Sequence, residues 1–567
     1  MAFPFGPSRG VSRRTFLGAG AAAGAALAAG NWPSLLQAAV TRPIPYAEAP
    51  WIEATIPQLQ SLMTAGKLTS RELVQGYLAR IEALNPLLHA VIETNSQAES
   101  IAARLDNERR AGRARGPLHG IPVLVKDNVA TDDAMQTTAG SLALVNSRVP
   151  ADAPLVAQLR AAGAVILGKA NLSEWANWRG WDSISGWSAR GGFTVCPYVL
   201  DDNPWGSSSG SAVAAAANLC AAAVGSETDG SIMAPSHANS AFGLKPTVGR
   251  ISGSGIIPIA HSQDTAGPIT RNATDAALLL GALSDPQHPF SVTLERGALS
   301  GVRLGLDPKY FETWDWGSPY FKPVIDQVLQ ALQDLGAVLV TIDTDPAWLA
   351  SGDETTVLRY EFKAQIAEYL ATLQHSEART LADLIQFNNT HCWQEMTYFG
   401  QGIFEWCEES SGDLTTPEYV TARENCITNS RTLGIDKALA DYDVDALISP
   451  TWTWLYSFAA VAGYPSVSLP AGYMPYEVVG APWDPAAVVT HQGSPVGFCF
   501  VGGAWQEAKL LRFAYDLEQE LNARRQPQYL RQVPERTVAG YCTGKPKMHG
   551  GTGNVDWRAN ARGKHVI

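Results

Sequence analysis

Apolar residues along this chain of 567 residues alternate between helical and strand-like spacing. The first clear helix pattern follows position 69, where apolar residues recur every three or four positions: Leu73, Tyr77, Ile81 and Leu84. Thr69 and Glu72 have the spacing of a capping box, in which each side chain satisfies a free main-chain N–H group. The pattern therefore predicts a helix that begins directly after Thr69.

Short apolar runs of the buried-strand type stand on either side of the next helix pattern. Residues 123–125 and 164–167 are two such runs. Between them, a helix pattern over residues 153–162 ends at Gly163, as expected for a helix C-terminus. This order predicts strands that are buried in the core and connected by a helix.

The second half of the chain repeats this alternation. Residues 303–306 and 338–342 bracket a helix pattern over residues 323–335, an order that favours parallel pairing of the two strands. Residues 212–224 are rich in alanine and predict one buried helix, and residues 351–423 predict a mostly helical segment. The patterns together indicate the α/β class.

Composition narrows the possible functions. Hydrophobic residues make up 46% of the chain and charged residues 17%, which suits a large core. The formal net charge of −12 argues against a nucleic-acid partner, which requires basic patches. The seven cysteines show neither a CxxC pair nor metal-ligand spacing, so we expect no metal site. We expect these cysteines to be free and buried, with a disulfide between two of Cys392, Cys407 and Cys426 as the alternative.

The N-terminus carries a pattern typical of export signals. Residues 12–18 match the twin-arginine pattern, and an apolar segment rich in alanine and glycine follows over residues 17–30. That segment is too short to span a bilayer, which takes about 20 apolar residues. We expect residues 1–39 to be a signal peptide, residues 40–535 the main domain and residues 536–567 a loosely ordered tail. The mature protein would then lie in the periplasm or outside the cell, without a membrane partner.

Two clusters of serine and glycine contain the candidate chemistry. One covers residues 203–211 and includes Ser207, and the other covers residues 226–232 and includes Ser231. A serine becomes a nucleophile only where a base takes its proton. Lys126 ends an apolar, strand-like run, where burial favours the neutral amine, and a neutral lysine can act as that base.

These motifs resemble those of the amidase signature family: a lysine in Lys-Asp-Asn, a Gly/Ser-rich run and a serine in Gly-Ser-Ile. The resemblance runs from about residue 56 to about residue 518 and includes further segments at residues 116–120, 137–141, 168–174, 243–249, 264–268, 463–470 and 495–498. It implies an amidase-signature fold, with a single large, mixed and twisted β-sheet covered by helices on both sides. It also implies hydrolysis of amide bonds without a cofactor.

The resemblance also implies roles for particular residues. Lys126, Ser207 and Ser231 would form the catalytic triad, with Ser231 as the nucleophile and Ser207, on a cis peptide bond, as the bridge. The oxyanion hole would be made by main-chain N–H groups of one loop: Thr228, Asp229, Gly230 and Ser231. We expect the substrate to be bound by Thr138, Ser208, Trp178 and Trp454, although a single tryptophan is more often a core residue.

The serine clusters and residues 262–268 are most similar to those of bacterial peptide amidases, which release ammonia from C-terminally amidated peptides. Export suits such a role and argues against the tRNA-amidotransferase branch of the family. Met233 stands where the family commonly carries an arginine, so any role of that arginine is in doubt here. A broader aliphatic or aryl-acyl amidase or esterase would use the same triad and is the alternative.

Two interpretations from other classes compete with this one. Residues 206–210 also fit the Gly-x-Ser-x-Gly elbow of Ser/His/Asp hydrolases, but the hydrophobic strand that must precede the elbow is missing. We therefore expect His237 and His261 to be packing or surface residues. A non-catalytic periplasmic binding protein on this fold would have lost part of the triad, and all of its residues are present. The expected partner is a small-molecule or peptide amide.

Overall fold

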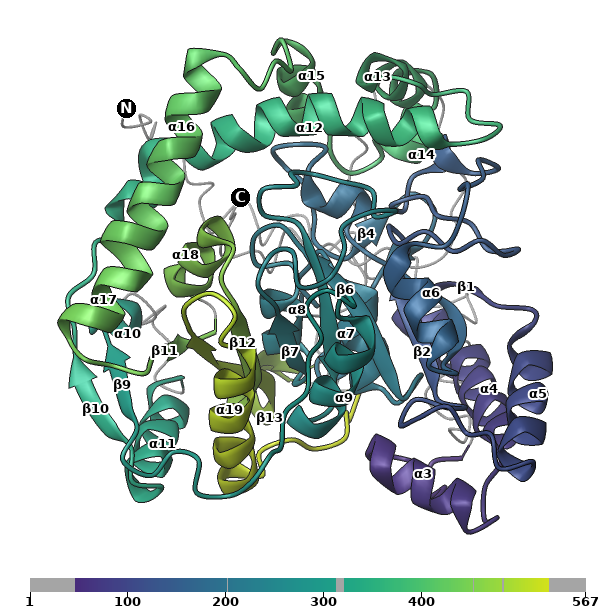
Figure 1. Ribbon diagram of the computed structural model, residues 1–567, viewed down its shortest axis with the longest axis vertical. Coiled ribbons are helices and arrows are strands. Elements are labelled where there is room, and N and C mark those ends of the chain that lie inside the picture. The colour runs from purple at the N-terminus through teal and green to yellow at the C-terminus, as the bar shows by residue number, and fades with distance from the viewer. Residues whose placement is uncertain (1–45, 201, 313–320, 452, 482–483, 530–567) are drawn as a thin grey trace.

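The computed structural model describes residues 46–200, 202–312, 321–451, 453–481 and 484–529 (Figure 1). Its strands are β1 (Val91–Thr94), β2 (Pro122–Lys126), β3 (Val165–Ala170), β4 (Trp187–Ser188), β5 (Gly192–Phe193), β6 (Ala222–Glu227), β7 (Phe242–Lys245), β8 (Thr265–Thr270), β9 (Arg303–Leu306), β10 (Val338–Thr341), β11 (Ala446–Pro450), β12 (Ser466–Ala481) and β13 (Asp484–Val501). Eleven of them form one sheet in the order β1-β3-β2-β6-β8-β7-β12-β13-β11-β9-β10, and β4 pairs with β5. The predicted single large mixed sheet is confirmed.

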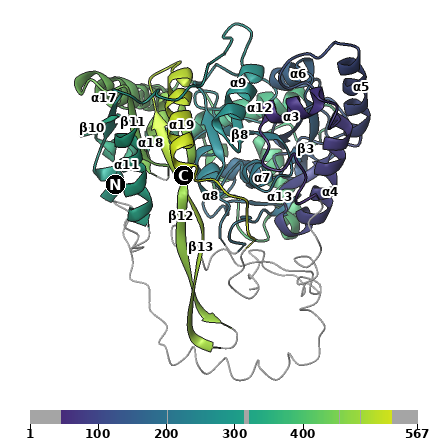
Figure 2. The same cartoon turned by 90° about the horizontal axis from the view of Figure 1, so that it is seen from below.

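The α-helices are α3 (Ile56–Thr64), α4 (Ser70–Leu88), α5 (Ala98–Arg110), α6 (Pro154–Ala161), α7 (Ser209–Ala216), α8 (Met233–Ala238), α9 (Ala273–Leu283), α10 (Lys309–Glu312), α11 (Phe321–Asp334), α12 (Asp353–Thr372), α13 (Leu381–Thr390), α14 (Cys392–Glu395), α15 (Gly402–Glu408), α16 (Pro417–Ile427), α17 (Asp436–Asp441), α18 (Trp454–Ala462) and α19 (Glu507–Leu521). Helix α9 packs against both α6 and α19 over one face of the sheet, and α7 and α8 lie on the other face (Figures 1 and 2). Both faces of the central strands are therefore buried, which explains why these strands are apolar without alternation.

Strand direction brings the candidate chemistry to one edge of the sheet. β2 is parallel to both of its neighbours, β3 and β6, with Val123 opposite Ala222. The carboxyl ends of β2 and β6 therefore lie side by side, at Lys126 and Glu227. Ligands of open α/β sheets bind outside the carboxyl ends of the strands.

Most predicted elements occur where the sequence placed them. Thr69 and Glu72 form the expected capping box, and α4 begins at Ser70. The two apolar runs of the first half are β2 and β3, with α6 between them. β9 and β10 are parallel neighbours on either side of α11, as predicted. The segment predicted to be mostly helical contains α12 to α16.

The prediction of one helix over residues 212–224 is wrong. α7 ends at Ala216, Asn218 adopts a left-handed conformation with φ of 54°, and β6 begins at Ala222. β6 pairs with β2 on one side and with β8 on the other. A short apolar run buried on both faces has no alternation that distinguishes strand from helix, so this strand depends on its tertiary partners.

The expectation for the cysteines holds at some positions and fails at one. Five are free and buried: Cys196, Cys220, Cys407, Cys426 and Cys499. Cys392 is disulfide-bonded, so the expectation of a free thiol is wrong there. Cys407 and Cys426 are free, which also excludes a disulfide between two of the three residues considered. Cys542, the predicted signal peptide and the predicted C-terminal tail lie outside the described residues.

β12 and β13 form a long antiparallel hairpin whose far end extends beyond the helices (Figure 2). Its near end is part of the sheet, where Ser466 pairs with Lys245 of β7 and Phe498 pairs with Pro450 of β11. Within the described parts of the chain, no helix is long and apolar enough to cross a membrane.

The start of α7 requires glycine at position 210. A Cβ there would lie 2.3 Å from the carbonyl oxygen of Ala90 and 2.5 Å from main-chain atoms of Asn171. Because these atoms belong to the main chain, we expect Gly210→Ala to lower the free energy of unfolding by about 1–3 kcal/mol. Chemical denaturation measures the change, and Gly253→Ala, with no atom within 4 Å of its Cβ, is the control. Equal stability of the two variants would contradict this packing.

Candidate active site

Lys126 is the last residue of β2 and is completely buried. Its Nζ lies 2.8 Å from Ser207 Oγ, 3.0 Å from Ser226 Oγ and 3.1 Å from the carbonyl oxygen of Ser226. Burial lowers the pKa of Lys126 to about 7, although the charges of Glu227 and Asp264 act in the opposite direction. The neutral amine has one lone pair and two N–H groups, which match these three contacts.

Ser207 and Ser208 lie in the turn that leads into α7, and both are buried. The peptide bond between Gly206 and Ser207 is cis, as the resemblance implied. Ser208 Oγ donates to the carbonyl oxygen of Ser226 at 3.0 Å and accepts from its N–H at 3.1 Å. The N–H of Ser208 donates to the carbonyl oxygen of Ser231 at 3.1 Å. These bonds hold the turn against both β6 and the loop that carries Ser231.

Ser231 lies in the loop between β6 and α8, and only 5% of it is exposed. The buried Glu227 carboxylate accepts hydrogen bonds from the N–H groups of Ile232 at 2.6 Å and Met233 at 3.0 Å, which fixes the end of this loop. The N–H groups of Thr228, Asp229 and Ser231 donate to no acceptor within the described residues. Donors of this kind can stabilise a developing oxyanion.

Helix α18 supports the other side of this loop. Ser457 Oγ donates to the carboxylate of Asp229 at 3.0 Å. Tyr456 packs on Gly230, where an added Cβ would lie only 2.7 Å from the tyrosine ring. Burial and the nearby Glu354 carboxylate raise the pKa of Asp229 well above its usual range. The hydrogen bond from Ser457 and the charge of Lys245 act to lower this pKa.

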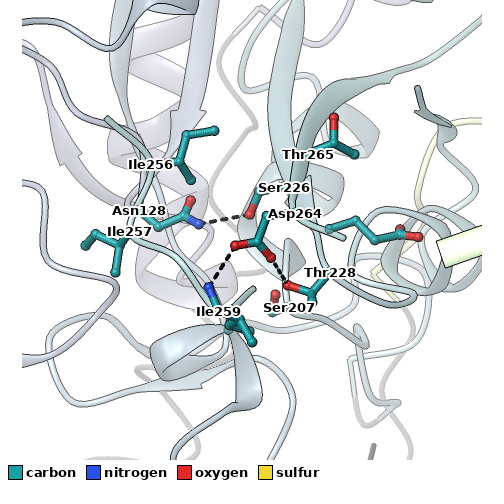
Figure 3. Close-up of a pocket in the computed structure, with 11 residues that line it drawn as sticks. Asn128, Ser207, Ser226, Thr228, Ile256, Ile257, Ile259, Asp264 and Thr265 are labelled. Atoms are coloured by element: carbon teal, nitrogen blue, oxygen red, sulfur yellow. Dashed lines mark hydrogen bonds between the residues drawn. The ribbon is translucent and has the colours of Figure 1, made fainter. Parts of the chain in front are cut away.

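A narrow, partly enclosed pocket lies beside Ser207 (Figure 3). Asp264 lines it and accepts hydrogen bonds from Thr228 Oγ1 at 2.6 Å and from the N–H groups of Ile259 and Ala260 at 2.8 and 3.0 Å. Burial raises the pKa of Asp264 to about 7, while these hydrogen bonds act to lower it. The Asp264 side chain thus ties the Ser231 loop to the chain that precedes β8.

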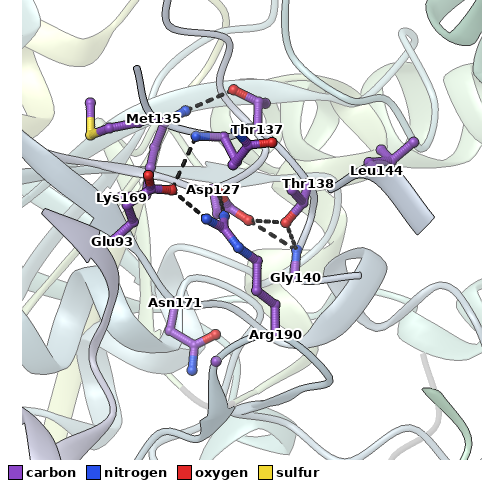
Figure 4. A network of polar contacts seen from close by, with 12 residues as sticks. Glu93, Asp127, Met135, Thr137, Thr138, Gly140, Leu144, Lys169, Asn171 and Arg190 are labelled. Atoms are coloured by element: carbon purple, nitrogen blue, oxygen red, sulfur yellow. Dashed lines mark hydrogen bonds and ion pairs between the residues drawn. The ribbon is translucent and has the colours of Figure 1, made fainter. Parts of the chain in front are cut away.

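Asp127, the residue after the lysine, belongs to a second polar network (Figure 4). Its carboxylate accepts hydrogen bonds from the Thr138 hydroxyl and the Gly140 N–H, and it pairs with Arg190 at 3.2 Å. Arg190 also forms an ion pair with Glu93. Thr138, which we expected to bind substrate, is fully buried in this network.

The other expected substrate-binding residues also lie outside the pocket lining beside Ser207. The hydroxyl of Ser208 is bonded to β6, as described above. Trp178 is fully buried in a hydrophobic cluster, whereas Trp454, the first residue of α18, is 51% exposed. Of the two, the structure leaves only Trp454 open to a ligand in solution.

Several residues of the site could not be found from the sequence. Ser226 Oγ lies between Lys126 Nζ and the Asn128 amide, which donates to it at 2.9 Å. Asp264 stands in one of the segments that carried the resemblance, but its bond to the Ser231 loop joins residues far apart in sequence. Tyr456 carries no local signal, because only the packing of α18 brings it to the loop.

The two histidines near the serines lie where the sequence placed them, one packed and one on the surface. His237 is buried, and its Nδ1 accepts a hydrogen bond from the N–H of Gly497 at 2.8 Å. Burial lowers its pKa to about 4. His261 is exposed. Among the described residues, no group of three or more His, Cys, Asp or Glu side chains is placed to hold a metal ion.

A buried lysine hydrogen-bonded to a serine, beside a second serine loop at the carboxyl edge of a mixed sheet, defines an enzyme of the amidase signature class. The chain belongs to the Amidase family, whose profile matches residues 72–511. It is therefore an enzyme that hydrolyses amides.

Known proteins similar to this chain support the assignment. The crystal structure of the peptide amidase from Stenotrophomonas maltophilia is 45% identical in sequence with a TM-score of 0.76, and the match covers 85% of this chain and 99% of that one. The crystal structure of an amidase family protein from Bacillus anthracis is 34% identical with a TM-score of 0.74, over 84% of this chain and 92% of that one. A probable amidase of Arabidopsis thaliana is 38% identical over 84% of this chain and 92% of its own length.

Proposed function

We propose that this enzyme hydrolyses the C-terminal carboxamide of amidated peptides and releases ammonia. The observation that carries the proposal is the 2.8 Å contact between Lys126 Nζ and Ser207 Oγ, fully buried beside the Ser231 loop. The similarity to the peptide amidase of S. maltophilia supports the choice of substrate. It extends over nearly all of that protein.

In the proposed mechanism, neutral Lys126 takes the proton of the Ser207 hydroxyl while Ser207 takes that of Ser231. Ser231 Oγ attacks the carboxamide carbon and forms a tetrahedral oxyanion. The proton returns through Ser207 to the leaving nitrogen, ammonia departs, and the acyl group stays on Ser231. Water repeats these steps and releases the peptide acid.

The oxyanion is assigned to the main chain of the Ser231 loop. Of the four N–H groups that the resemblance suggested, we select those of Thr228, Asp229 and Ser231, which have no other acceptor within the described residues. The Gly230 N–H instead faces the Glu227 carboxylate and helps to lower its pKa against the effect of burial. Loss of one such donor typically costs about 3–4 kcal/mol of transition-state stabilisation.

The mechanism predicts that Asp264 affects how kcat/KM depends on pH. Because the negative charge of Asp264 raises the pKa of Lys126, Asp264→Asn should lower that pKa. The ascending limb of the profile of kcat/KM against pH should then move to lower pH. Thermal unfolding of the same variant shows whether the fold is kept. A folded variant whose profile is unchanged would contradict the assignment of this limb to Lys126.

We also propose that the enzyme is exported by the twin-arginine route and works in the periplasm or outside the cell. The pattern at residues 12–18 supports this proposal, and it lies outside the described residues. Replacing Arg13 and Arg14 by lysine should keep the protein in the cytoplasm, as cell fractionation would show. Equal export of the variant would contradict the proposal.

A comparison of three substrates tests the proposed activity. We expect ammonia release from a C-terminally amidated dipeptide, and a much lower kcat/KM for an aryl amide. The same dipeptide with a free carboxylate should give no ammonia. A preference for the aryl amide would instead favour a broad aliphatic or aryl-acyl amidase. No turnover of any amide would favour the non-catalytic alternative.

A further inference from the structure

The pocket beside Ser207 has room for only a very small group (Figure 3). Its cavity volume is about 10 Å³. A cavity needs roughly this volume to hold one water molecule. Its apolar lining consists of Ala176 and three isoleucines, Ile256, Ile257 and Ile259, each of which is at least nine-tenths buried. An amino-acid side chain therefore does not fit unless these isoleucines move.

The polar lining of the same pocket suits a small group with N–H donors. Ser207, Thr228 and Asp264 contribute hydroxyl and carboxylate oxygens to it. Ammonia is about the size of water and carries three N–H groups, each of which requires an acceptor when it is buried. The size and the polarity of the pocket therefore both fit a ligand such as ammonia.

The position of the pocket agrees with the position that the leaving nitrogen must take. Ser207 returns the proton to that nitrogen, so the nitrogen has to come within hydrogen-bond distance of Ser207 Oγ. In the proposed mechanism, the carbonyl oxygen of the same substrate group is held by the main-chain N–H groups of the Ser231 loop. The pocket is lined by Ser207 and by Thr228, at the start of the Ser231 loop, so it adjoins the serine that the leaving nitrogen has to contact.

We propose that this pocket receives the leaving nitrogen of the substrate, and that Ile256, Ile257 and Ile259 restrict that nitrogen to ammonia. The proposal rests on the proposed roles of Ser207 and Ser231. The Ser231 Oγ–carbon bond forms first and gives the tetrahedral oxyanion. When that intermediate collapses, the carbon–nitrogen bond breaks and its electron pair stays on nitrogen. The Ser231 proton, relayed by Ser207, completes NH₃ in the pocket. Peptide bonds are spared because their leaving nitrogen carries a chain.

The test is a change in leaving-group preference. We measure kcat/KM of the full-length enzyme for a dipeptide amide and for the N-methylamide of the same dipeptide. Ile257→Ala should raise the ratio of N-methylamide to primary amide turnover by about tenfold or more. One carbon group more or less in an apolar pocket typically changes the ratio of kcat/KM values by about 10- to 200-fold. Ile251→Ala, at a buried isoleucine outside the pocket lining, should keep the wild-type ratio.

Ile257→Val removes less of the side chain and provides a second variant if Ile257→Ala does not fold. It should raise the ratio in the same direction, by a smaller factor. A folded variant at position 257 that still cleaves the primary amide could keep the wild-type ratio of N-methylamide to primary amide turnover. That result would overturn the pocket assignment and leave the peptide amidase proposal standing. A wild type that releases no ammonia from the dipeptide amide would instead overturn the proposed function itself.

Discussion

Ser231→Ala is expected to lower kcat/KM for an amidated dipeptide by roughly 10⁴- to 10⁶-fold, as removal of a catalytic serine does in other serine hydrolases. The variant keeps the main-chain N–H groups that we assign to the oxyanion, so a small residual rate from direct attack by water is expected. Nothing else in the loop should move, because its fixed points are the Glu227 carboxylate and helix α18. Ammonia release measures the loss.

Ser254→Ala provides the matched control, because Ser254 is an exposed serine outside the site. It should show the wild-type rate, and both variants should unfold at the wild-type temperature. Full activity in Ser231→Ala would show that another group attacks the amide. Unfolding of Ser231→Ala at a much lower temperature would show a structural role for Ser231 instead.

Lys126→Met is expected to lower kcat/KM by roughly 10²- to 10⁴-fold, the usual contribution of a general base. The pH dependence of wild-type kcat/KM should show the same role of Lys126. The pKa of Lys126 is about 7, so the amine is protonated and inactive as a base below that pH and neutral above it. Wild-type kcat/KM should therefore rise as the pH increases through about 7, and this limb should be missing in Lys126→Met.

A second buried lysine offers a control for burial alone. Lys169 is also fully buried, and burial lowers its pKa to about 8, but its Nζ contacts Thr137 and the carbonyl oxygen of Val129. Folded Lys169→Met should retain the ascending limb near pH 7. If Lys169→Met lost this limb and Lys126→Met kept it, the base would be misassigned.

How far the sequence predicts the fold depends on whether the signal is local. The start of α4 is encoded in Thr69 and Glu72 themselves, and the structure places it there. β6 is different, because its alanines and glycine fit a helix as well as a strand until β2 and β8 pair with them. The need for glycine at position 210 follows only from the three-dimensional structure, because there the main chain at Ala90 and Asn171 leaves no room for a Cβ.

The site shows the same division. Lys126, Ser207 and Ser231 stand in short motifs, so their sequence neighbours identify them, and the fold brings them to one edge of the sheet. The surroundings that adjust them come from distant parts of the chain. Ser457 reaches Asp229 from a helix more than two hundred positions away in the sequence. Motifs thus identify the proposed reacting groups, whereas the pocket lining and the pKa shifts follow only from the packed structure.

Identification of the acylated residue during turnover tests the proposed activity most directly. The full-length enzyme is mixed with excess amidated dipeptide, quenched in acid within the first turnovers, digested and analysed by mass spectrometry. We predict a dipeptidyl ester on the fragment that contains Ser231, formed together with ammonia and absent from Ser231→Ala. An ester on Ser207 or on any other residue would contradict the proposed mechanism.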